Sequence, residues 1–185
     1  MSRFSPEDSI EDLTQVLRGV STDEMQAFED ALLKSRRVFV TGLGRTGLMA
    51  RGFAMRLMHL GRRVYHVGDV ITPAIRQRDL LVICTRTGGS KILLHYIEIA
   101  RRAKARVAVV TSHPDNPVAQ AANVVLTLSD EPVLARRREG GSPAHPLGSL
   151  FEQALLVVLD QVVMSLMERL ELTEGDLAKV HTTFE

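Results

Sequence analysis

The sequence predicts an α/β fold in which a parallel sheet is covered by helices on both faces. Short apolar runs alternate along the chain with longer amphipathic stretches of helical period. The runs are almost continuously Val, Ile and Leu, which is typical of strands that are buried on both faces. Five such runs occur: Val38–Thr41, Val64–Val67, Leu80–Cys84, Val107–Thr111 and Val124–Leu128.

Helix signals precede the first run and lie between several of the others. Ser5, followed by a proline, and Ser21, with Glu24 three residues later, are N-terminal capping patterns. They predict two helices before the first strand. Amphipathic patterns predict two further helices over Thr46–Leu60 and Ser90–Ala103.

The last quarter of the chain predicts a loop and then a long helix. Residues Ser129–Pro146 contain three prolines and two glycines and are expected to form a loop, in which Arg136–Arg138 are solvated or lie over a phosphate. The helix over about Gly148–Leu170 is apolar on nearly every side, which predicts a subunit contact. We expect one domain over 1–185, with N-terminal helices in 1–36 and a C-terminal helix and tail in 148–185.

Composition excludes several classes of protein. The chain is 45% hydrophobic and 24% charged, which is ordinary for a soluble globular protein. A net charge of +1 gives no field that favours nucleic acid. The single cysteine, Cys84, forms no internal disulfide and fits a cytoplasmic location. Acids within Met1–Val20 argue against a secretory signal, and four polar residues within Leu150–Met167 argue against a membrane span.

The first strand is followed by a glycine-rich turn that opens a helix. Thr41–Gly47 carries glycines at 42, 44 and 47, which let the backbone approach an anion at a helix N-terminus. The same spacing matches the dinucleotide fingerprint, and Asp69 lies 22 residues beyond Gly47, so NAD binding is one alternative. A tight turn that needs glycine for structural reasons is another.

The third strand is followed by hydroxyl-bearing residues that also open a helix. Thr85, Thr87 and Ser90 are separated by Gly88 and Gly89. Hydroxyls and helix amides donate hydrogen bonds to phosphate oxygens, and the helix dipole favours negative charge. The alternative is an ordinary helix cap at Ser90 with turn residues before it. Because two anion-type loops lie at strand ends, an anionic sugar or nucleotide is the favoured ligand.

These loops and several further stretches resemble the sugar isomerase (SIS) domain and, within it, the 6-phospho-3-hexuloisomerases. The resemblance implies a three-layer sandwich with a five-stranded parallel sheet flanked by helices. It runs from about Val38 to the C-terminus. The similar stretches are Gly42–Gly47, Phe53–Gly61, Ile71–Ile75, Thr111–Ala119, Gly148–Glu152 and His181–Glu185.

The resemblance implies an isomerase that interconverts D-arabino-hex-3-ulose 6-phosphate and fructose 6-phosphate through a 2,3-enediol, without metal or cofactor. Such enzymes belong to formaldehyde assimilation through ribulose monophosphate, and the resemblance further implies a homotetramer. It makes Thr85, Thr87 and Ser90 the phosphate ligands, in a loop shaped by Gly88 and Gly89.

The resemblance also suggests which residues carry the chemistry. Glu152 is the candidate base, although an acid there also suits a first helical turn. His181 suits ring opening or proton shuttling, unless it is an idle exposed residue; the tail and last helix are expected to complete a neighbour's site. In the first loop, Gly44 and Arg45 are candidate substrate contacts, while Arg45 also fits a subunit contact or a solvated surface cation.

One departure from the family keeps other functions open. The family's strand-three loop usually reads Ser-Gly-Ser-Gly, whereas this chain has Thr85-Arg86-Thr87-Gly88. The Arg86 side chain either turns outward or adds a guanidinium to the anion site. The alternatives are a phosphosugar-binding module without turnover, an isomerase of another sugar phosphate, and a nucleotide-binding Rossmann protein.

Overall fold

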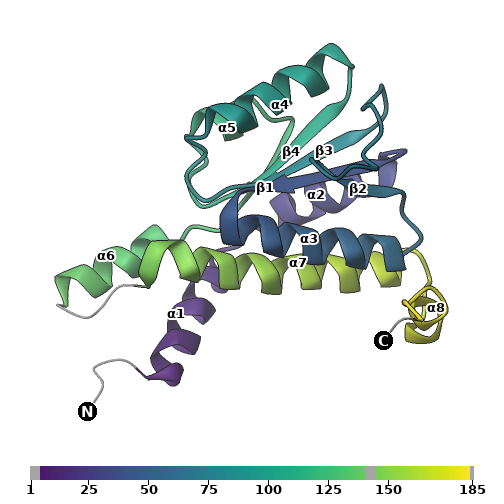
Figure 1. The fold of residues 1–185 in the computed structure, drawn as a ribbon. Coiled ribbons are helices and arrows are strands. Elements are labelled where there is room, and N and C mark those ends of the chain that lie inside the picture. The colour runs from purple at the N-terminus through teal and green to yellow at the C-terminus, as the bar shows by residue number, and fades with distance from the viewer. Residues whose placement is uncertain (1–4, 141–144, 184–185) are drawn as a thin grey trace.

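A five-stranded parallel sheet forms the centre of the molecule (Figure 1). The computed structural model describes residues 5–140 and 145–183. The strands lie in the order β2-β1-β3-β4-β5, and every neighbouring pair is parallel. Their bounds are β1 Val38–Gly42, β2 Val64–His66, β3 Leu80–Cys84, β4 Arg106–Thr111 and β5 Val124–Thr127. The predicted strands are therefore confirmed, with ends that differ by one residue.

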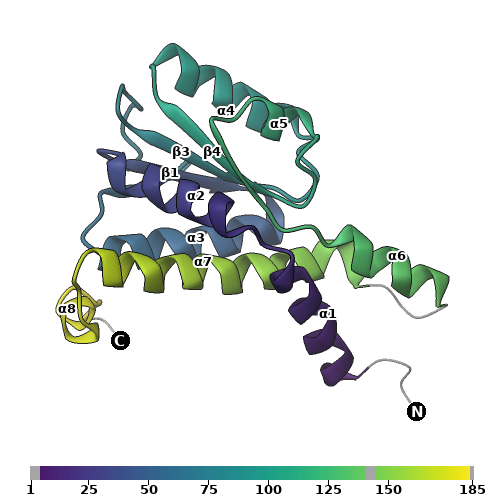
Figure 2. The same cartoon turned by 180° about the vertical axis from the view of Figure 1, so that it is seen from behind.

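Helices cover the sheet on both faces, as predicted. Helices α2 (Thr22–Lys34), α3 (Gly44–His59) and α7 (Ser149–Arg169) lie on one face, and α4 (Lys91–Arg102) and α5 (Pro117–Gln120) lie on the other (Figures 1 and 2). Alternate strand residues point to opposite faces. Val38 and Val40 accordingly belong to the core under α2, α3 and α7, whereas Phe39 belongs to the core under α4 and α5.

The two helices predicted before the first strand are α1 (Pro6–Arg18) and α2, and both begin at the predicted capping residues. The side chains of Ser5 and Ser21 accept hydrogen bonds from the backbone amides of Asp8 and Glu24. Helix α1 packs against α7 and extends away from the sheet (Figure 2).

The loop predicted over 129–146 is wrong in its first half, because residues Glu131–Glu139 form helix α6. Pro132 stands in the first turn, where a missing backbone N–H costs no helical hydrogen bond. Arg136 and Arg137 therefore lie on a helix and not in a loop, and both bond the buried Asp12 of α1. Residues 141–144 lie outside the described residues, and a short turn of 3-10 helix, Pro146–Gly148, precedes α7.

Helix α7 is the longest helix among the described residues, at 21 residues. Residues 146–169 are long and apolar enough to span a membrane by length and composition. However, 56% of the apolar 18-residue stretch within this range is buried inside the protein. Such burial is typical of a core helix in a soluble protein. Leu156, Val157 and Met164 nevertheless remain exposed on α7. Helix α8 (Glu174–Ala178) follows α7, and the predicted tail is described as far as residue 183.

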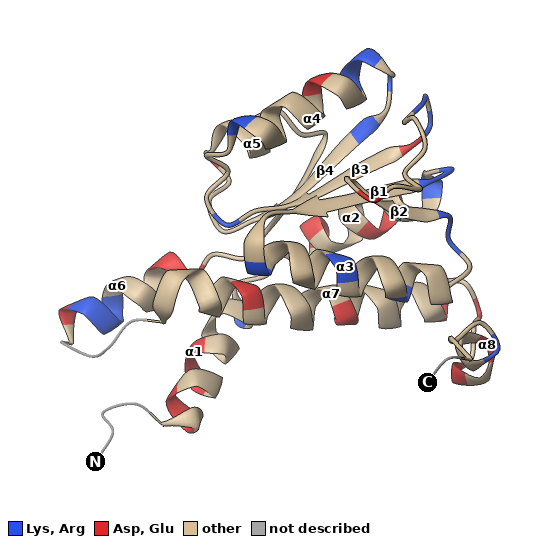
Figure 3. Cartoon of the chain, viewed as in Figure 1, with Lys and Arg blue, Asp and Glu red and all other residues tan. Residues whose placement is uncertain are grey.

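Residues of both charge signs are distributed along the helices and loops in the cartoon of Figure 3. Acidic residues lie along α1, and α6 carries basic residues next to them in space. Arg137 connects these two helices through Asp12. These charges therefore stabilise the contact between α1 and α6.

Candidate active site

The two loops singled out from the sequence lie side by side at the point where the strand order reverses. Strands β1 and β3 are neighbours, with Gly42 paired to Cys84 at their carboxyl ends. The chain runs from β1 outward to β2 and then returns to β3 on the other side. In open parallel sheets the crevice at such a point is where ligands bind.

The glycines of the first loop are required by close packing between the end of β1 and the start of α3. A Cβ at Gly47 would lie 2.5 Å from the backbone oxygen of Gly42, so helix α3 packs against the strand end only because both residues lack side chains. Gly44 has φ +57°, in the left-handed region. The tight-turn interpretation is confirmed, and it accounts for the G-x-G-x-x-G spacing without a dinucleotide.

The second loop, Thr85–Ser90, is called the hydroxyl loop below. Gly88 has φ +62°, and a Cβ there would overlap the Asn116 side chain, so only glycine fits. The Gly88 amide donates to Thr85 Oγ1 at 3.2 Å, which closes the turn. Thr85 and Ser90 are half-buried and Thr87 is exposed. The loop thus has a fixed backbone and hydroxyls within reach of a ligand.

Helices α3 and α4 both begin at these loops without the usual charge compensation. Neither has a side-chain cap or an acid in its first turn. Ser90 occupies the cap position of α4, yet its hydroxyl makes no capping hydrogen bond, unlike Ser5 and Ser21 at α1 and α2. The predicted position of Ser90 at the cap is therefore confirmed, but its hydroxyl does not cap the helix. Two uncompensated helix N-termini at one crevice favour an anion.

Glu152 lies in the first turn of α7 and faces the start of α3. The residue is 8% exposed, and its Oε2 atom lies 3.1 Å from Nη1 of Arg45. This atom is buried and makes no hydrogen bond within 5–140 and 145–183, so the contact with Arg45 is an ion pair of unaligned geometry. Arg45 is itself 61% exposed. The structure thus pairs Arg45 with Glu152, two residues that the sequence had suggested separately.

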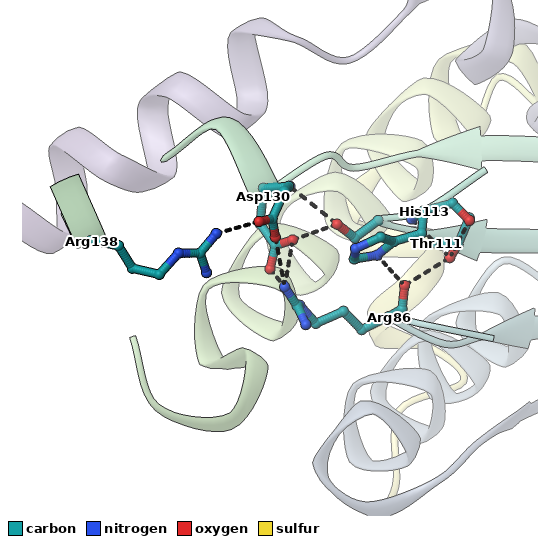
Figure 4. A network of polar contacts seen from close by, with 7 residues as sticks. Arg86, Thr111, His113, Asp130 and Arg138 are labelled. Carbon is teal, nitrogen blue, oxygen red and sulfur yellow. Dashed lines mark hydrogen bonds and ion pairs between the residues drawn. The ribbon is translucent and has the colours of Figure 1, made fainter. Parts of the chain in front are cut away.

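Arg86 turns away from the hydroxyl loop (Figure 4). Its Nε and Nη2 atoms donate to the two carboxylate oxygens of Asp130 at 2.7 and 3.1 Å. Asp130 is fully buried and also accepts a short hydrogen bond from the Ser112 hydroxyl. Asp130 and Ser112 are not predicted from the sequence, because no local spacing links Asp130 to Arg86, 44 positions earlier, or to Ser112, 18 positions earlier.

His181 lies far from Glu152 in this chain. Its ring stacks on that of His59, with centroids 5.2 Å apart, and His59 ends α3 whereas Arg45 begins it. A helix of 16 residues is about 24 Å long. A hollow of about 500 Å³ surrounds His181, lined also by Arg56, His59 and Lys179. One chain therefore does not bring the two candidate catalytic residues together.

The described residues contain neither a cluster of metal-ligating side chains nor a reactive thiol. Among the described residues, no group of three or more His, Cys, Asp or Glu side chains is arranged to hold a metal ion. Cys84 is fully buried at the end of β3, and burial raises the pKa of its thiol to about 12. This thiol is protonated at neutral pH and is no nucleophile.

Comparison with known proteins defines first the class of this chain. The SIS domain model matches residues 31–135, which is more than half of the sequence. The hypothetical protein of Methanococcus jannaschii, for which a function of 3-hexulose-6-phosphate isomerase was inferred from its crystal structure, has a TM-score of 0.81 with this chain. The two are 25% identical, and the match covers 97% of this chain and 98% of the other. The fold is therefore that of a SIS domain.

Sequence relatives then identify the family. The 3-hexulose-6-phosphate isomerase of Bacillus subtilis is 34% identical over 90% of this chain and 89% of its own length. The enzyme of the same name from Mycobacterium gastri is 36% identical over 90% of this chain and 82% of its own length. The chain belongs to the 3-hexulose-6-phosphate isomerase family of SIS domain proteins, and it is a sugar-phosphate isomerase.

Proposed function

We propose that this chain interconverts D-arabino-hex-3-ulose 6-phosphate and fructose 6-phosphate within the ribulose monophosphate pathway. The observation that carries the proposal is the shared carboxyl end of β1 and β3. The glycine-shaped hydroxyl loop and the uncapped N-termini of α3 and α4 lie there, and the buried carboxylate of Glu152 pairs with Arg45 of α3. A phosphate monoester suits the first two features, and a carbon-bound proton suits the third.

The hydroxyl loop anchors the phosphate in this proposal. Thr85, Thr87 and Ser90 donate their hydroxyl protons to phosphate oxygens, and the backbone at Gly88 and Gly89 allows close approach. The N-terminal amides of α4 add further donors. The phosphate is remote from the reacting carbons, so its role is to hold these carbons at the correct position relative to the base.

Glu152 serves as the base. It removes the proton from C2 of the 3-ulose, which gives the enediolate of the 2,3-enediol with its charge on O3. The hydroxyl proton on O2 then moves to O3, and the protonated base returns its proton to C3, which leaves the carbonyl at C2. Arg45 compensates the carboxylate charge and, with the backbone of Gly44, contacts substrate oxygens. His181 opens the sugar ring or carries a proton.

Because His181 and Glu152 lie at opposite ends of α3 in one chain, a shared use of both requires a second chain. The exposed apolar side chains of α7 support such a contact, since a face of this kind is stabilised by burial. We therefore infer a homo-oligomer, a tetramer by family resemblance, located in the cytoplasm and built from one SIS domain per chain. Residues 1–36 supply its N-terminal helices and 148–185 its C-terminal helix and tail.

A coupled assay tests this function. The purified chain is supplied with the 3-ulose 6-phosphate, and fructose 6-phosphate formation is followed through its conversion to glucose 6-phosphate and reduction of NADP. The proposal predicts turnover by the wild-type chain. Binding of fructose 6-phosphate without turnover would contradict it and favour a phosphosugar-binding module. Turnover of a different sugar phosphate alone would reassign the substrate.

A further inference from the structure

We propose that Arg86 is a positioning residue of the isomerase: with its guanidinium held by Asp130, its stem fixes the hydroxyl loop relative to the helix that carries Glu152. The proposal rests on the proposed function of both elements. Its first support is the direction of the guanidinium, which is held by both oxygens of Asp130 and lies 3.7 Å from an oxygen of Glu131 (Figure 4). Because its Nε and Nη2 atoms donate to Asp130, this guanidinium is directed away from a phosphate in the hydroxyl loop.

The hydroxyl loop keeps its internal shape without the guanidinium. The backbone oxygen of Arg86 accepts hydrogen bonds from Thr111 Oγ1 at 3.0 Å and from the Ser112 amide at 3.2 Å. The Gly88 backbone lies directly against Asn116, whose amide donates to Thr111 Oγ1 at 2.9 Å. The β4 end therefore fixes the loop backbone, and the guanidinium adds a separate connection.

That connection reaches α7. A Cβ at Gly148 would lie 2.8 Å from Cδ of Arg86, so the arginine stem packs against the backbone that starts α7. Gly148 has φ +86°, which an L side chain rarely adopts, and Glu152 follows one helical turn later. The Arg86 side chain thus spans from the hydroxyl loop across the start of α7 to Asp130 at the start of α6.

The ion pair is largely shielded from solvent, which makes it a rigid connection. The Arg86 side chain is 25% exposed, and that of Asp130 is completely buried. The Ser112 hydroxyl both donates to Asp130 Oδ1 and accepts from the Asp130 amide, at 3.2 Å for the latter contact. A buried, doubly bonded pair of this kind has a fixed geometry.

Loss of the Arg86–Asp130 pair is expected to affect the rate of turnover and not the binding of the phosphate group. Loss of the pair leaves the phosphate ligands in place but lets the loop and α7 shift relative to one another. A displacement of about 1 Å at a reacting centre can reduce the rate by about 10²-fold. Arg86 variants therefore lower kcat while the affinity for the phosphate group is retained.

The test compares four variants with the wild-type chain: Arg86→Gln, Arg86→Lys, Asp130→Asn and the double variant Arg86→Gln/Asp130→Asn. The matched control is Arg138→Gln, which removes a neighbouring guanidinium that pairs with Glu131 on exposed helix surface. For each we measure kcat, KM, inhibition by inorganic phosphate and the thermal midpoint. Amide exchange of residues 149–152, at the start of α7, is followed as well.

We expect Arg86→Gln and Asp130→Asn each to lower kcat by about tenfold or more, with KM and the phosphate inhibition constant within about threefold. The double variant is expected to be no slower than the slower single variant, because both remove the same contact. Arg86→Lys recovers part of kcat, and Arg138→Gln behaves as wild type. Wild-type kcat in Arg86→Gln would overturn the proposal. So would a rise of tenfold or more in KM and the phosphate constant confined to the Arg86 variants, since that identifies a phosphate ligand.

Two further results keep the test decisive. If Asp130→Asn fails to fold, the contrast between Arg86→Gln and Arg86→Lys decides alone. If the wild-type chain does not isomerise its substrate, the proposed function fails. The connection is then judged by amide exchange, which Arg86→Gln must raise at residues 149–152 of α7 and Arg138→Gln must leave unchanged. Equal exchange in these two variants would overturn it.

Discussion

At the scale of single residues, the candidate active site combines a buried carboxylate, Glu152, with an exposed cation, Arg45. Glu152 is 8% exposed, and its Oε2 atom has the Arg45 guanidinium as its charged neighbour. Isolated buried carboxylates are strongly destabilising, whereas a paired one persists. Placement of this pair beside the hydroxyl loop is consistent with a base that is held ready for substrate.

Replacement of Glu152 by Gln is expected to lower kcat by about 10²-fold or more, because an amide does not accept the carbon-bound proton. The isosteric change keeps the packing of α7, so the thermal midpoint serves as the folding control. Steady-state kinetics in the coupled assay measure the effect. Near-normal turnover would remove Glu152 from its assigned role.

Gly88 and Gly89 form a matched pair for the backbone of the hydroxyl loop. Gly88→Ala places a methyl group against the Asn116 side chain at φ +62°, and we expect it to reduce the free energy of unfolding by more than about 1 kcal/mol. Gly89→Ala meets no atom within 4 Å and is expected to change it by less than about 0.5 kcal/mol. Urea unfolding of both variants makes the comparison. Equal stabilities would show that the close approach at Gly88 is not needed.

At the scale of helices and strands, local patterns predicted most elements but not the contacts between them. The strands were predictable because a run such as Leu80–Cys84 is continuously apolar and buried on both faces. Helix α6 was missed because the glycines and prolines around it outweighed the short polar helix between them. The pairs Arg45–Glu152 and Arg86–Asp130 join distant parts of the chain, so no local spacing indicates them.

The outer strand β2 ends in a histidine that makes stability depend on pH. Both ring nitrogens of His66 are buried and make no hydrogen bond among the described residues. Burial, together with the charge of Arg51, lowers the pKa of His66 below its ordinary 6.5, against the opposing effect of Asp69. The unfolded chain therefore binds a proton more readily than the folded one. The stability contributed by neutral His66 is present above pH 6.5 and is lost as pH falls from there towards the folded-state pKa.

His66→Gln should accordingly flatten the pH dependence of stability. We expect the free energy of unfolding of the wild-type chain to fall between about pH 7.5 and about pH 5.5, and this fall to be smaller in the variant. Urea titrations at the two pH values measure it. The control is His95→Gln, on the exposed side of α4, which should keep the wild-type slope. An unchanged slope in His66→Gln would contradict the assignment.

At the scale of the whole molecule, one chain separates the two candidate catalytic residues. Glu152 lies beside the start of α3, while His181 stacks on His59 at its end. The exposed apolar residues Leu156 and Met164 of α7 lie in the same helix as Glu152. A complete site of the proposed kind thus depends on assembly, which the sequence predicts through the apolar character of that helix and through the family resemblance.

Mixed assemblies of two inactive variants test this dependence. Glu152→Gln and His181→Gln chains are denatured together, refolded at equal amounts and assayed. If each site takes Glu152 from one chain and His181 from another, random assembly restores about a quarter of wild-type activity. Each variant refolded alone is the control. Absence of any recovery in verified mixed oligomers would show that the site does not draw these residues from different chains.

The most direct measurement for the whole account is a crystal structure of the chain with fructose 6-phosphate bound. The account predicts phosphate oxygens within hydrogen-bond distance of the hydroxyls of Thr85, Thr87 and Ser90, with the sugar carbons directed towards Glu152. A phosphate bound instead in the basic hollow of Arg56, His59 and Lys179, with the hydroxyl loop empty, would contradict it.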